Sequence, residues 1–334
     1  MTFKILSMKH PGFHIIPVLC FLWLSLSGCI HTYPDGDGID PTLVQLGVEV
    51  SIDIDWQPIE VALTKADDIK DCTHRLIIEF NRNGKLHGRC EHLLSEEEYA
   101  KGNIKLIMPF DFNAVTYDIS AWLDCLVNDN NENFYNTSSL AEITRNDNHI
   151  VWTDVAECAF ASTSVNLQEY KDQWNAKVVV PITLTSPIAR FEFVATDFSE
   201  FYDFIAPNIG KGETYTVCLA FECRIAKAFN AAKNEGATYL SNPEYYFSLS
   251  PPEIESSGGK IICGSIFLGD RPQTIQAKVL VFNSARMIVS KSPTIQFSVE
   301  RGKITKITGD MLTDYYTGSF NINNIWDGEI IIEL

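Results

Sequence analysis

The sequence is poor in basic residues and has no long apolar run. It contains 26 lysines and arginines against 43 aspartates and glutamates, and its formal net charge is −17 at pH 7. Proteins that bind nucleic acids neutralise phosphates with lysine and arginine, so this balance argues against a nucleic-acid partner. A membrane-spanning helix needs about 20 consecutive apolar residues. The apolar stretch near the start, residues 15–26, is too short for this, and His14 and Pro17 border or interrupt it.

Motifs of the common enzyme classes are also absent. The chain has no Gly-x-Ser-x-Gly, His-Glu-x-x-His, Walker or Gly-x-Gly-x-x-Gly pattern. His87, Cys90 and His92 lie close in sequence, but a metal site needs more ligands at a suitable spacing. Asp53 and Asp55 could be arranged as glycosidase carboxylates, although a solvated acidic strand face is the simpler interpretation. We therefore predict no enzyme activity, no metal and no cofactor.

Three other short motifs favour a structural interpretation. Residues 35–40 are similar to part of a calcium loop, but the distal glutamate is missing. Residues 258–260 lack the strand–helix context of a phosphate-binding loop and are better explained as a hairpin turn. Residues 136–138 match a eukaryotic glycosylation acceptor, a pattern too short to indicate a function by itself.

The start of the chain has the features of an export signal. Lys4 and Lys9 precede the apolar stretch without any acidic residue, as in secretory signals. The stretch ends in Leu26-Ser27-Gly28-Cys29, which resembles the bacterial lipobox. That resemblance implies cleavage before Cys29 and acylation of its thiol and amine by fatty acids such as palmitate. An ordinary signal peptide with a chance cysteine remains the alternative. We assign 1–28 to the signal and 29–42 to a lipidated tether.

Seven cysteines remain beyond the signal and the lipobox. The number is odd and the spacings fit no small disulfide scaffold. Cys125, Cys218 and Cys263 lie in apolar strand-like runs, where buried free thiols are common. Cys72 and Cys90 flank a predicted hairpin. Because exported proteins form disulfides, these two cysteines are the first candidates for a bridge.

Alternating apolar and polar residues predict an all-β chain. Val48–Trp56 alternates with an acidic face, the pattern of a half-buried antiparallel strand. Asn83-Gly84 between strand-like runs predicts a hairpin turn, and Ser95–Glu98 predicts a capped helical turn. A polar, asparagine-rich loop follows at Asn128–Asn136. We assign 43–168 to an N-terminal β-sandwich.

A second series of strands follows position 174 and predicts a C-terminal β-sandwich over 174–334. Arg190 alternates with Phe191 and Phe193, so we expect it on the outer face of its strand. Helices are expected at Phe198–Ile205, after the N-cap type residue Asp197, and at the alanine-rich stretch Ile225–Lys233.

Several passages together resemble the FimB-type fimbrial anchor and fimbrillin-like lipoprotein family of Bacteroidales, the components of type V pili. The most telling passage is Pro187–Asp197. Three passages come before it: Asp40–Trp56, Met108–Phe112 and Val115–Trp122. Gly212–Tyr215 and Phe229–Asn230 follow it in the order expected for that family, and Val299–Asp310 comes after them. The resemblance covers nearly the whole chain after Cys29. It implies two tandem transthyretin-like β-sandwich domains, mostly antiparallel, with a few short helices.

The resemblance also implies a place in a surface fibre. Fibre subunits of that family lose their first strand to a protease, often after an arginine, and a neighbour's strand fills the groove. Exchange works because an open sheet edge accepts main-chain hydrogen bonds. Here no arginine lies between Cys29 and His74, and the first one after the lipobox is Arg75. Cleavage there would cut at the start of the next strand.

We therefore predict a lipid-anchored fimbrial anchor or accessory subunit that keeps its first strand. Its partners would be the outer membrane, through the lipid on Cys29, and fimbrial subunits, by strand exchange. The location would be the cell outer membrane, with the protein facing outward. The alternative is a surface adhesin that binds glycan or host protein, with Phe134 and Tyr135 of the asparagine-rich loop as the contact.

Overall fold

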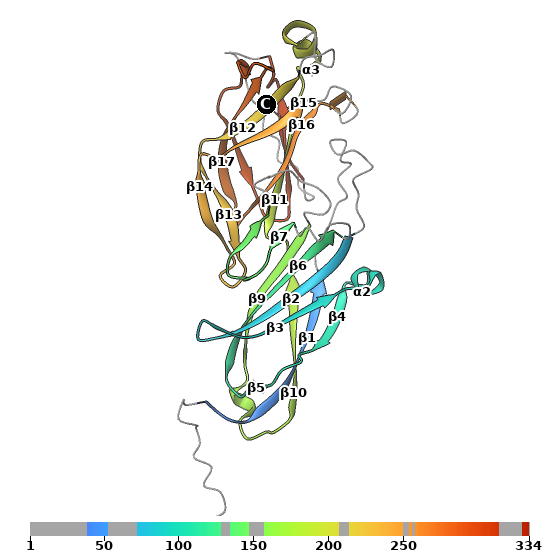
Figure 1. Ribbon diagram of the computed structural model, residues 1–334, viewed down its shortest axis with the longest axis vertical. Coiled ribbons are helices and arrows are strands. Elements are labelled where there is room, and N and C mark those ends of the chain that lie inside the picture. Colours follow the sequence, from blue (N-terminus) through green and yellow to red (C-terminus); the bar gives the residue numbers. More distant parts are fainter. Residues whose placement is uncertain are drawn as a thin grey trace, which may run out of the picture.

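Two β-sandwiches lie end to end along the long axis of the molecule (Figure 1). The structure is a computed structural model, and it describes residues 39–52, 72–127, 134–146, 157–206, 214–249, 254–255, 258–313 and 329–333. Strands dominate these residues, which confirms the predicted all-β fold with a few short helices. No helix among them is long and apolar enough to cross a membrane.

The N-terminal sandwich packs two sheets around one apolar core. The first sheet has the order β10 (Ala176–Leu184), β1 (Leu43–Ile52) and β4 (Asn103–Ile107), with β5 (Phe112–Asn113) also paired to β1; the second has the order β3 (Lys85–Leu93), β2 (Cys72–Arg82), β6 (Thr116–Val127) and β9 (Cys158–Asn166). Of the strand predicted over Val48–Trp56, residues 48–52 lie in β1, and the rest lies outside the described residues. The predicted Asn83-Gly84 turn joins β2 to β3 with φ of 50° and 73°. Both residues of a type I′ hairpin turn need such positive values.

The strand β10 corrects the predicted domain boundary. The sequence placed residues 174–184 in the second sandwich, but β10 pairs in parallel with β1 from Val44↔Ala176 to Ile52↔Leu184. A parallel partner must be brought back by a long crossover connection, so sequence proximity does not reveal the pairing. By strand pairing, the first sandwich extends to Leu184.

The C-terminal sandwich has its own core, built around phenylalanines of facing sheets such as Phe191 and Phe297. One sheet has the order β16 (Lys260–Phe267), β11 (Ile188–Ala195), β20 (Ile304–Gly309) and β21 (Glu329–Glu333); the other has the order β15 (Glu244–Leu249), β12 (Tyr215–Phe221), β17 (Gln273–Phe282) and β18 (Ile288–Lys291), with β19 (Ile295–Val299) also paired to β17. All residues of β11 are buried, because both faces of this central strand are covered.

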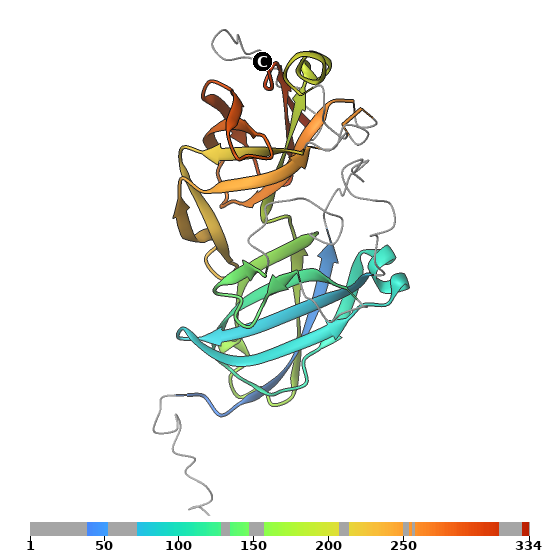
Figure 2. The same ribbon diagram turned by 45° about the horizontal axis from the view of Figure 1, so that its top comes forward.

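A fifth sheet joins the two sandwiches (Figures 1 and 2). Its order is β14 (Glu235–Ser241), β13 (Arg224–Asn230), β8 (Ile143–Arg145) and β7 (Tyr135–Asn136). β7 and β8 follow β6 of the first sandwich, whereas β13 and β14 belong to the second. Two register pairs connect them, Ala228↔Thr144 and Phe229↔Ile143. We call this sheet and the apolar cluster beneath it the joint.

The short helices only partly follow the prediction. The capped turn is α2 (Glu96–Lys101), where the Ser95 side chain accepts from Glu98 N and the Glu98 side chain accepts from Ser95 N. The helix predicted after Asp197 is α3 (Phe198–Glu200) followed by η5 (Phe201–Ile205), and η4 (Gln168–Tyr170) lies at a turn. The helix predicted over 225–233 is wrong, because β13 forms there. Its ladder with β14 and the burial of Ile225 and Phe229 override the helix preference of alanine.

Candidate functional site

The first strand is locked into the middle of its sheet. β1 lies between β10 and β4 and pairs with both. Val44, Leu46, Val48 and Val50 point into the core with at most 2% of their surface exposed. Burying each of these side chains contributes about 1.5–3 kcal/mol. Loss of β1 would therefore open the core and leave the edges of β10 and β4 without a partner.

The segment just ahead of β1 is held to the turn that precedes β10. Thr42 is buried, its carbonyl accepts from Ala114 N at 3.0 Å, and its hydroxyl accepts from Asp172 N at 3.0 Å. The Asp40 carboxylate accepts from Thr42 N at 2.9 Å. Asn175 N donates to the Leu43 carbonyl at 3.1 Å. We call these contacts between residues 40–43 and 171–175 the latch.

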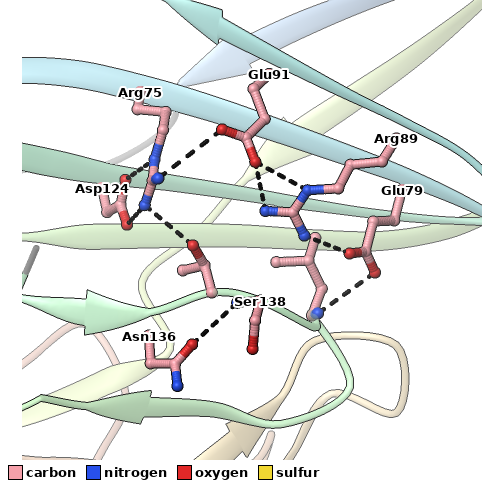
Figure 3. Close-up of polar contacts among 9 residues, drawn as sticks. Arg75, Glu79, Arg89, Glu91, Asp124, Asn136 and Ser138 are labelled. Atoms are coloured by element: carbon pink, nitrogen blue, oxygen red, sulfur yellow. Dashed lines mark hydrogen bonds and ion pairs between the residues drawn. The ribbon is translucent and has the colours of Figure 1, made fainter.

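Arg75, the first arginine after Cys29, is buried at the centre of an ionic network (Figure 3). Its Nε and Nη2 donate to the two carboxylate oxygens of Asp124 on β6 at 3.0 and 2.8 Å. Nη2 also donates to the Thr137 hydroxyl at 3.0 Å. Burial raises the pKa of Asp124, while the hydrogen bonds and charge of Arg75 act in the opposite direction. Such a bidentate ion pair fixes the orientation of both side chains.

A second arginine extends the network across the sheet to the loop between β7 and β8 (Figure 3). Arg89 of β3 donates to Glu79 of β2 at 2.6 Å and to Glu91 at 2.6 and 2.9 Å. The other carboxylate oxygen of Glu79 accepts from Leu140 N at 3.3 Å. The network therefore ties segment 137–140, through Thr137 and Leu140, to the outer face of the β3–β2–β6 sheet.

The joint continues as an apolar cluster between the sandwiches. From the first sandwich it includes Ile77, Trp122 and Phe160, and from the second Phe229 and Phe267. The Trp122 and Tyr135 rings lie 5.3 Å apart, and the Phe160 and Phe229 rings 4.7 Å apart. The sequence prediction missed this cluster. One signal was present: the unbroken run Leu76-Ile77-Ile78 departs from alternation, as in strands covered on both faces.

Contacts between charged groups and rings complete the joint. Arg145 of β8 donates to the Ser265 carbonyl and hydroxyl at 2.8 and 2.6 Å, and its guanidinium lies 5.2 Å from the Phe267 ring centroid. From the other direction, Arg301 of the second sandwich lies 4.8 Å over the Phe160 ring. Each sandwich thus supplies a cation to an aromatic ring of the other.

The aromatic pair proposed as a ligand contact belongs to this joint. Tyr135 is 1% exposed and packs on Trp122, and Phe134 packs against Tyr135 with ring centroids 4.9 Å apart. Burial raises the pKa of the Tyr135 hydroxyl. Both rings therefore take part in packing, and residues 128–133 of the loop lie outside the described residues.

The predicted Cys72–Cys90 disulfide is not formed, since Cys90 has a free thiol. The strand register gives the reason. Cys90 lies opposite Ile78 of β2, whereas Cys72 begins that strand. Six residues of strand span about 20 Å, and a disulfide needs Cα atoms within about 4.4–6.8 Å. The Cys72 side chain itself lies outside the described residues.

The prediction of buried thiols is right for two of three cysteines. Cys218 and Cys263 are buried and form no disulfide, as expected. Cys158, for which no prediction was made, is also buried and forms no disulfide. Cys125, expected to be free, is disulfide-bonded. Burial raises the pKa of Cys158 to about 12 and that of Cys218 to about 11, which keeps both as unreactive thiols at neutral pH. Cys29 lies outside the described residues, so its lipidation stays a prediction.

Both histidines of the candidate metal group make protein contacts. His87 bonds the Asp111 carbonyl at 3.0 Å, and His92 bonds Glu98 at 3.1 Å. Among the described residues, no three His, Cys, Asp or Glu side chains are grouped to hold a metal ion. Asp53 and Asp55 lie outside the described residues.

The remaining motifs have structural roles. Gly258 and Gly259 have φ of 71° and 92°, and a Cβ on Gly259 would lie 2.5 Å from the Ala195 carbonyl oxygen. Lys260 pairs with Glu192 at 2.9 Å instead of facing a phosphate. Thr137, of the glycosylation-like motif, is buried against Arg75. Of the calcium-like motif, only residues 39 and 40 are described.

Two further residues differ from their expected roles. Arg190 lies on the face of β11 away from the sandwich core, as predicted, but it is buried. Asp197 makes no capping bond to α3. Its two carboxylate oxygens accept from the backbone N–H groups of Met311, Leu312 and Thr313 at 2.6–3.1 Å. This carboxylate therefore fixes the chain that leaves β20.

The chain is similar, at low sequence identity, to several solved structures. No curated protein matches the chain. A fimbrial assembly protein from Parabacteroides distasonis is 10% identical, with 87% of this chain and 98% of that chain covered and a TM-score of 0.40. A putative adhesin from Bacteroides ovatus is 13% identical, with 75% and 76% covered and a TM-score of 0.41. These descriptions apply to those proteins.

The family assignment comes from the sequence match. Residues 41–334 match the family of unknown function DUF6562, a range that includes β1, the ionic network, the joint and β21. The match covers most of the chain, and the protein belongs to this family of unknown function.

Proposed function

We propose that the protein is a lipid-anchored anchor or accessory subunit of a surface fibre, which keeps both its lipid and its first strand. The lipobox-like Leu26-Ser27-Gly28-Cys29 would attach the chain to the outer membrane. Several acyl chains hold a protein firmly where one binds reversibly. The acidic balance of the chain supports attachment through lipid rather than through a basic patch.

The environment of Arg75 gives the strongest support to this proposal. An Arg-specific protease that freed β1 would have to cut at this residue, since none precedes it after Cys29. Arg75 is 8% exposed, sits in a strand paired on both sides and holds Asp124 with two hydrogen bonds. A protease needs an exposed, locally unfolded segment. The folded sandwich therefore protects the bond that strand release requires.

The fibre would be contacted through the part of the molecule distant from the lipid. The N-terminal end of β1 lies at the far end of the first sandwich from the second one (Figure 1). A lipid at that end leaves the second sandwich pointing away from the membrane. Fimbrial subunits joined by strand exchange are the proposed partners at that outer end.

The test compares wild type with Cys29→Ser in the native bacterium, with palmitate labelling and fractionation. Cys29→Ala serves as a second variant. We expect label and membrane retention in wild type only, and we expect fibres to be shed into the medium by both variants. Fibres that stay attached while the variant protein is released would contradict the anchor role.

A second experiment separates the anchor from the competing adhesin role. Replacing residues 128–133 by a short Gly-Ser linker leaves Phe134 and Tyr135 in the joint. An anchor would retain fibres and membrane attachment after this change. Lost binding to glycan or host protein, with fibres still attached, would favour the adhesin instead.

A further inference from the structure

We propose that the parallel pair β1–β10 is a force-bearing clamp, loaded in shear whenever the N-terminal tether is pulled against the second sandwich. The direction of this load in the cell rests on the proposed function. The clamp itself is a property of the fold and can be tested on the purified protein.

The two loaded points lie at opposite ends of one strand pair. The tether enters β1 at Leu43, whereas the chain passes from the end of β10, Leu184, into β11 of the second sandwich. β1 and β10 run parallel in an unbroken register of nine pairs, Val44↔Ala176 to Ile52↔Leu184. Figure 1 shows β1 starting at the lower end, away from the second sandwich. A pull along the molecule therefore slides the strands past each other and loads all their hydrogen bonds together.

The loaded start of β1 is reinforced by the latch. Thr42 bonds Asp172 N and Ala114 N, and Leu43 bonds Asn175 N. Asp40 bonds Thr42 N and lies 3.9 Å from Lys171. These contacts join residues 40–43 to Ala114, just after β5, and to the turn 171–175, just ahead of β10. A pull on the tether therefore has to break them as well as the start of the β1–β10 pair.

The proline in β10 does not interrupt the clamp. Thr185 exchanges both of its backbone hydrogen bonds with Phe160 of β9, at 2.9 Å each. The backbone N–H and C=O groups of successive residues point to opposite sides of a strand. The backbone groups of Pro181, four residues before Thr185, therefore also point toward β9. The N–H that proline lacks is thus not one that β1 needs. The backbone N–H groups of Val178 and Val180, an odd number of residues from Thr185, point toward β1.

The other end of the clamp is held by the joint. β8 pairs with β13, and Phe229 of β13 packs into the cluster with Phe160. Arg145 and Arg301 add contacts in both directions. A pull on the second sandwich therefore reaches the first through the joint as well as through the covalent link from Leu184 to β11.

Single-molecule force spectroscopy with two attachment pairs tests the proposal. Handles at Ile39 and Thr185 pull opposite ends of the pair and shear it, whereas handles at Ile39 and Trp174 pull the same ends and unzip it. Trp174 is 52% exposed, and Thr185 is also exposed, so both accept a handle. At one loading rate we expect a several-fold higher unfolding force in shear, because unzipping breaks the bonds one at a time. Equal forces in both geometries would overturn the clamp, whatever becomes of the lipid on Cys29.

A matched pair of proline variants tests whether the hydrogen bonds between β1 and β10 set the unfolding force in shear. Val178→Pro removes an N–H that faces β1, and we expect a lower shear force. Val179→Pro removes an N–H that faces away, at a side chain 60% exposed, and we expect the wild-type force. Circular dichroism selects folded variants. If both folded variants kept the wild-type force, or both lost it equally, the β1–β10 ladder would not be the clamp. If Val178→Pro does not fold, the comparison of attachment pairs still decides.

Discussion

At the scale of single residues, the buried guanidinium of Arg75 holds three other segments of the chain together, through Asp124, Thr137 and Glu91. Its place at the start of a strand, and the lack of any earlier arginine after Cys29, follow from the sequence. Its burial does not, because an arginine in a strand is normally solvated. Burial became feasible because Asp124, Thr137 and Glu91 converge on one guanidinium from three separate segments. Convergence of this kind depends on the register between strands.

The first prediction concerns the buried pair. Arg75→Ala leaves the Asp124 carboxylate, itself 1% exposed, without its main partner. Removing one member of a buried pair costs about 3–5 kcal/mol of unfolding free energy. Urea denaturation measures this loss. The control is Lys101→Ala, which breaks an exposed pair with Glu97 and should change stability little. Equal effects of the two variants would show that Arg75 is not a structural centre.

At the scale of elements, local patterns were reliable and long-range pairings were not. The Asn83-Gly84 turn and the α2 cap are encoded by neighbouring residues, and both are formed. The wrong helix over 225–233 and the misplaced β10 have one cause in common. Each becomes a strand through partners distant in sequence, β8 and β14 in one case and β1 in the other. Tertiary pairing overrides local propensity in such places.

The second prediction is a pH dependence of the α2 cap. Hydrogen bonds from Ser95 and His92 lower the pKa of Glu98 from 4.5 to about 2. A carboxyl with a lowered pKa in the folded state stabilises it above the unfolded pKa and loses this contribution as pH falls. We therefore expect the cap to weaken between about pH 4.5 and about pH 2. Hydrogen exchange of the α2 backbone amides measures this loss of stability. Glu98→Gln, which cannot ionise, is the control. An identical pH response of Glu98→Gln would contradict this assignment.

At the scale of the whole molecule, the two sandwiches are coupled through a shared interface and not only through the connecting chain. The joint has its own apolar core, its own sheet and the Arg75 and Arg89 network on one side. A sequence scan for linkers could not find it, because its strands come from a loop of one sandwich and a hairpin of the other. The all-β class was predictable from alternation, whereas the joint and the clamp were not.

The third prediction tests this coupling. Phe229 is fully buried in the joint, and Phe229→Ala should cost about 3–5 kcal/mol through lost packing and a cavity. Because Phe229 contacts residues of both sandwiches, we also expect calorimetry to show two separate unfolding transitions. Phe112→Ala, in the N-terminal core, is the control. It should destabilise the first sandwich without removing contacts of the joint. Superimposed transitions in Phe229→Ala would contradict coupling through this cluster.

We expect the mature protein to keep its lipid and its first strand. Mass spectrometry of the protein taken from the surface of its native bacterium tests this most directly. We predict an amino terminus at an acylated Cys29, with peptides of β1, including Leu43–Ile52, present in the same chain. A mature chain that begins beyond β1, at or after Arg75, and carries no acyl group would contradict the retention of the lipid and the first strand.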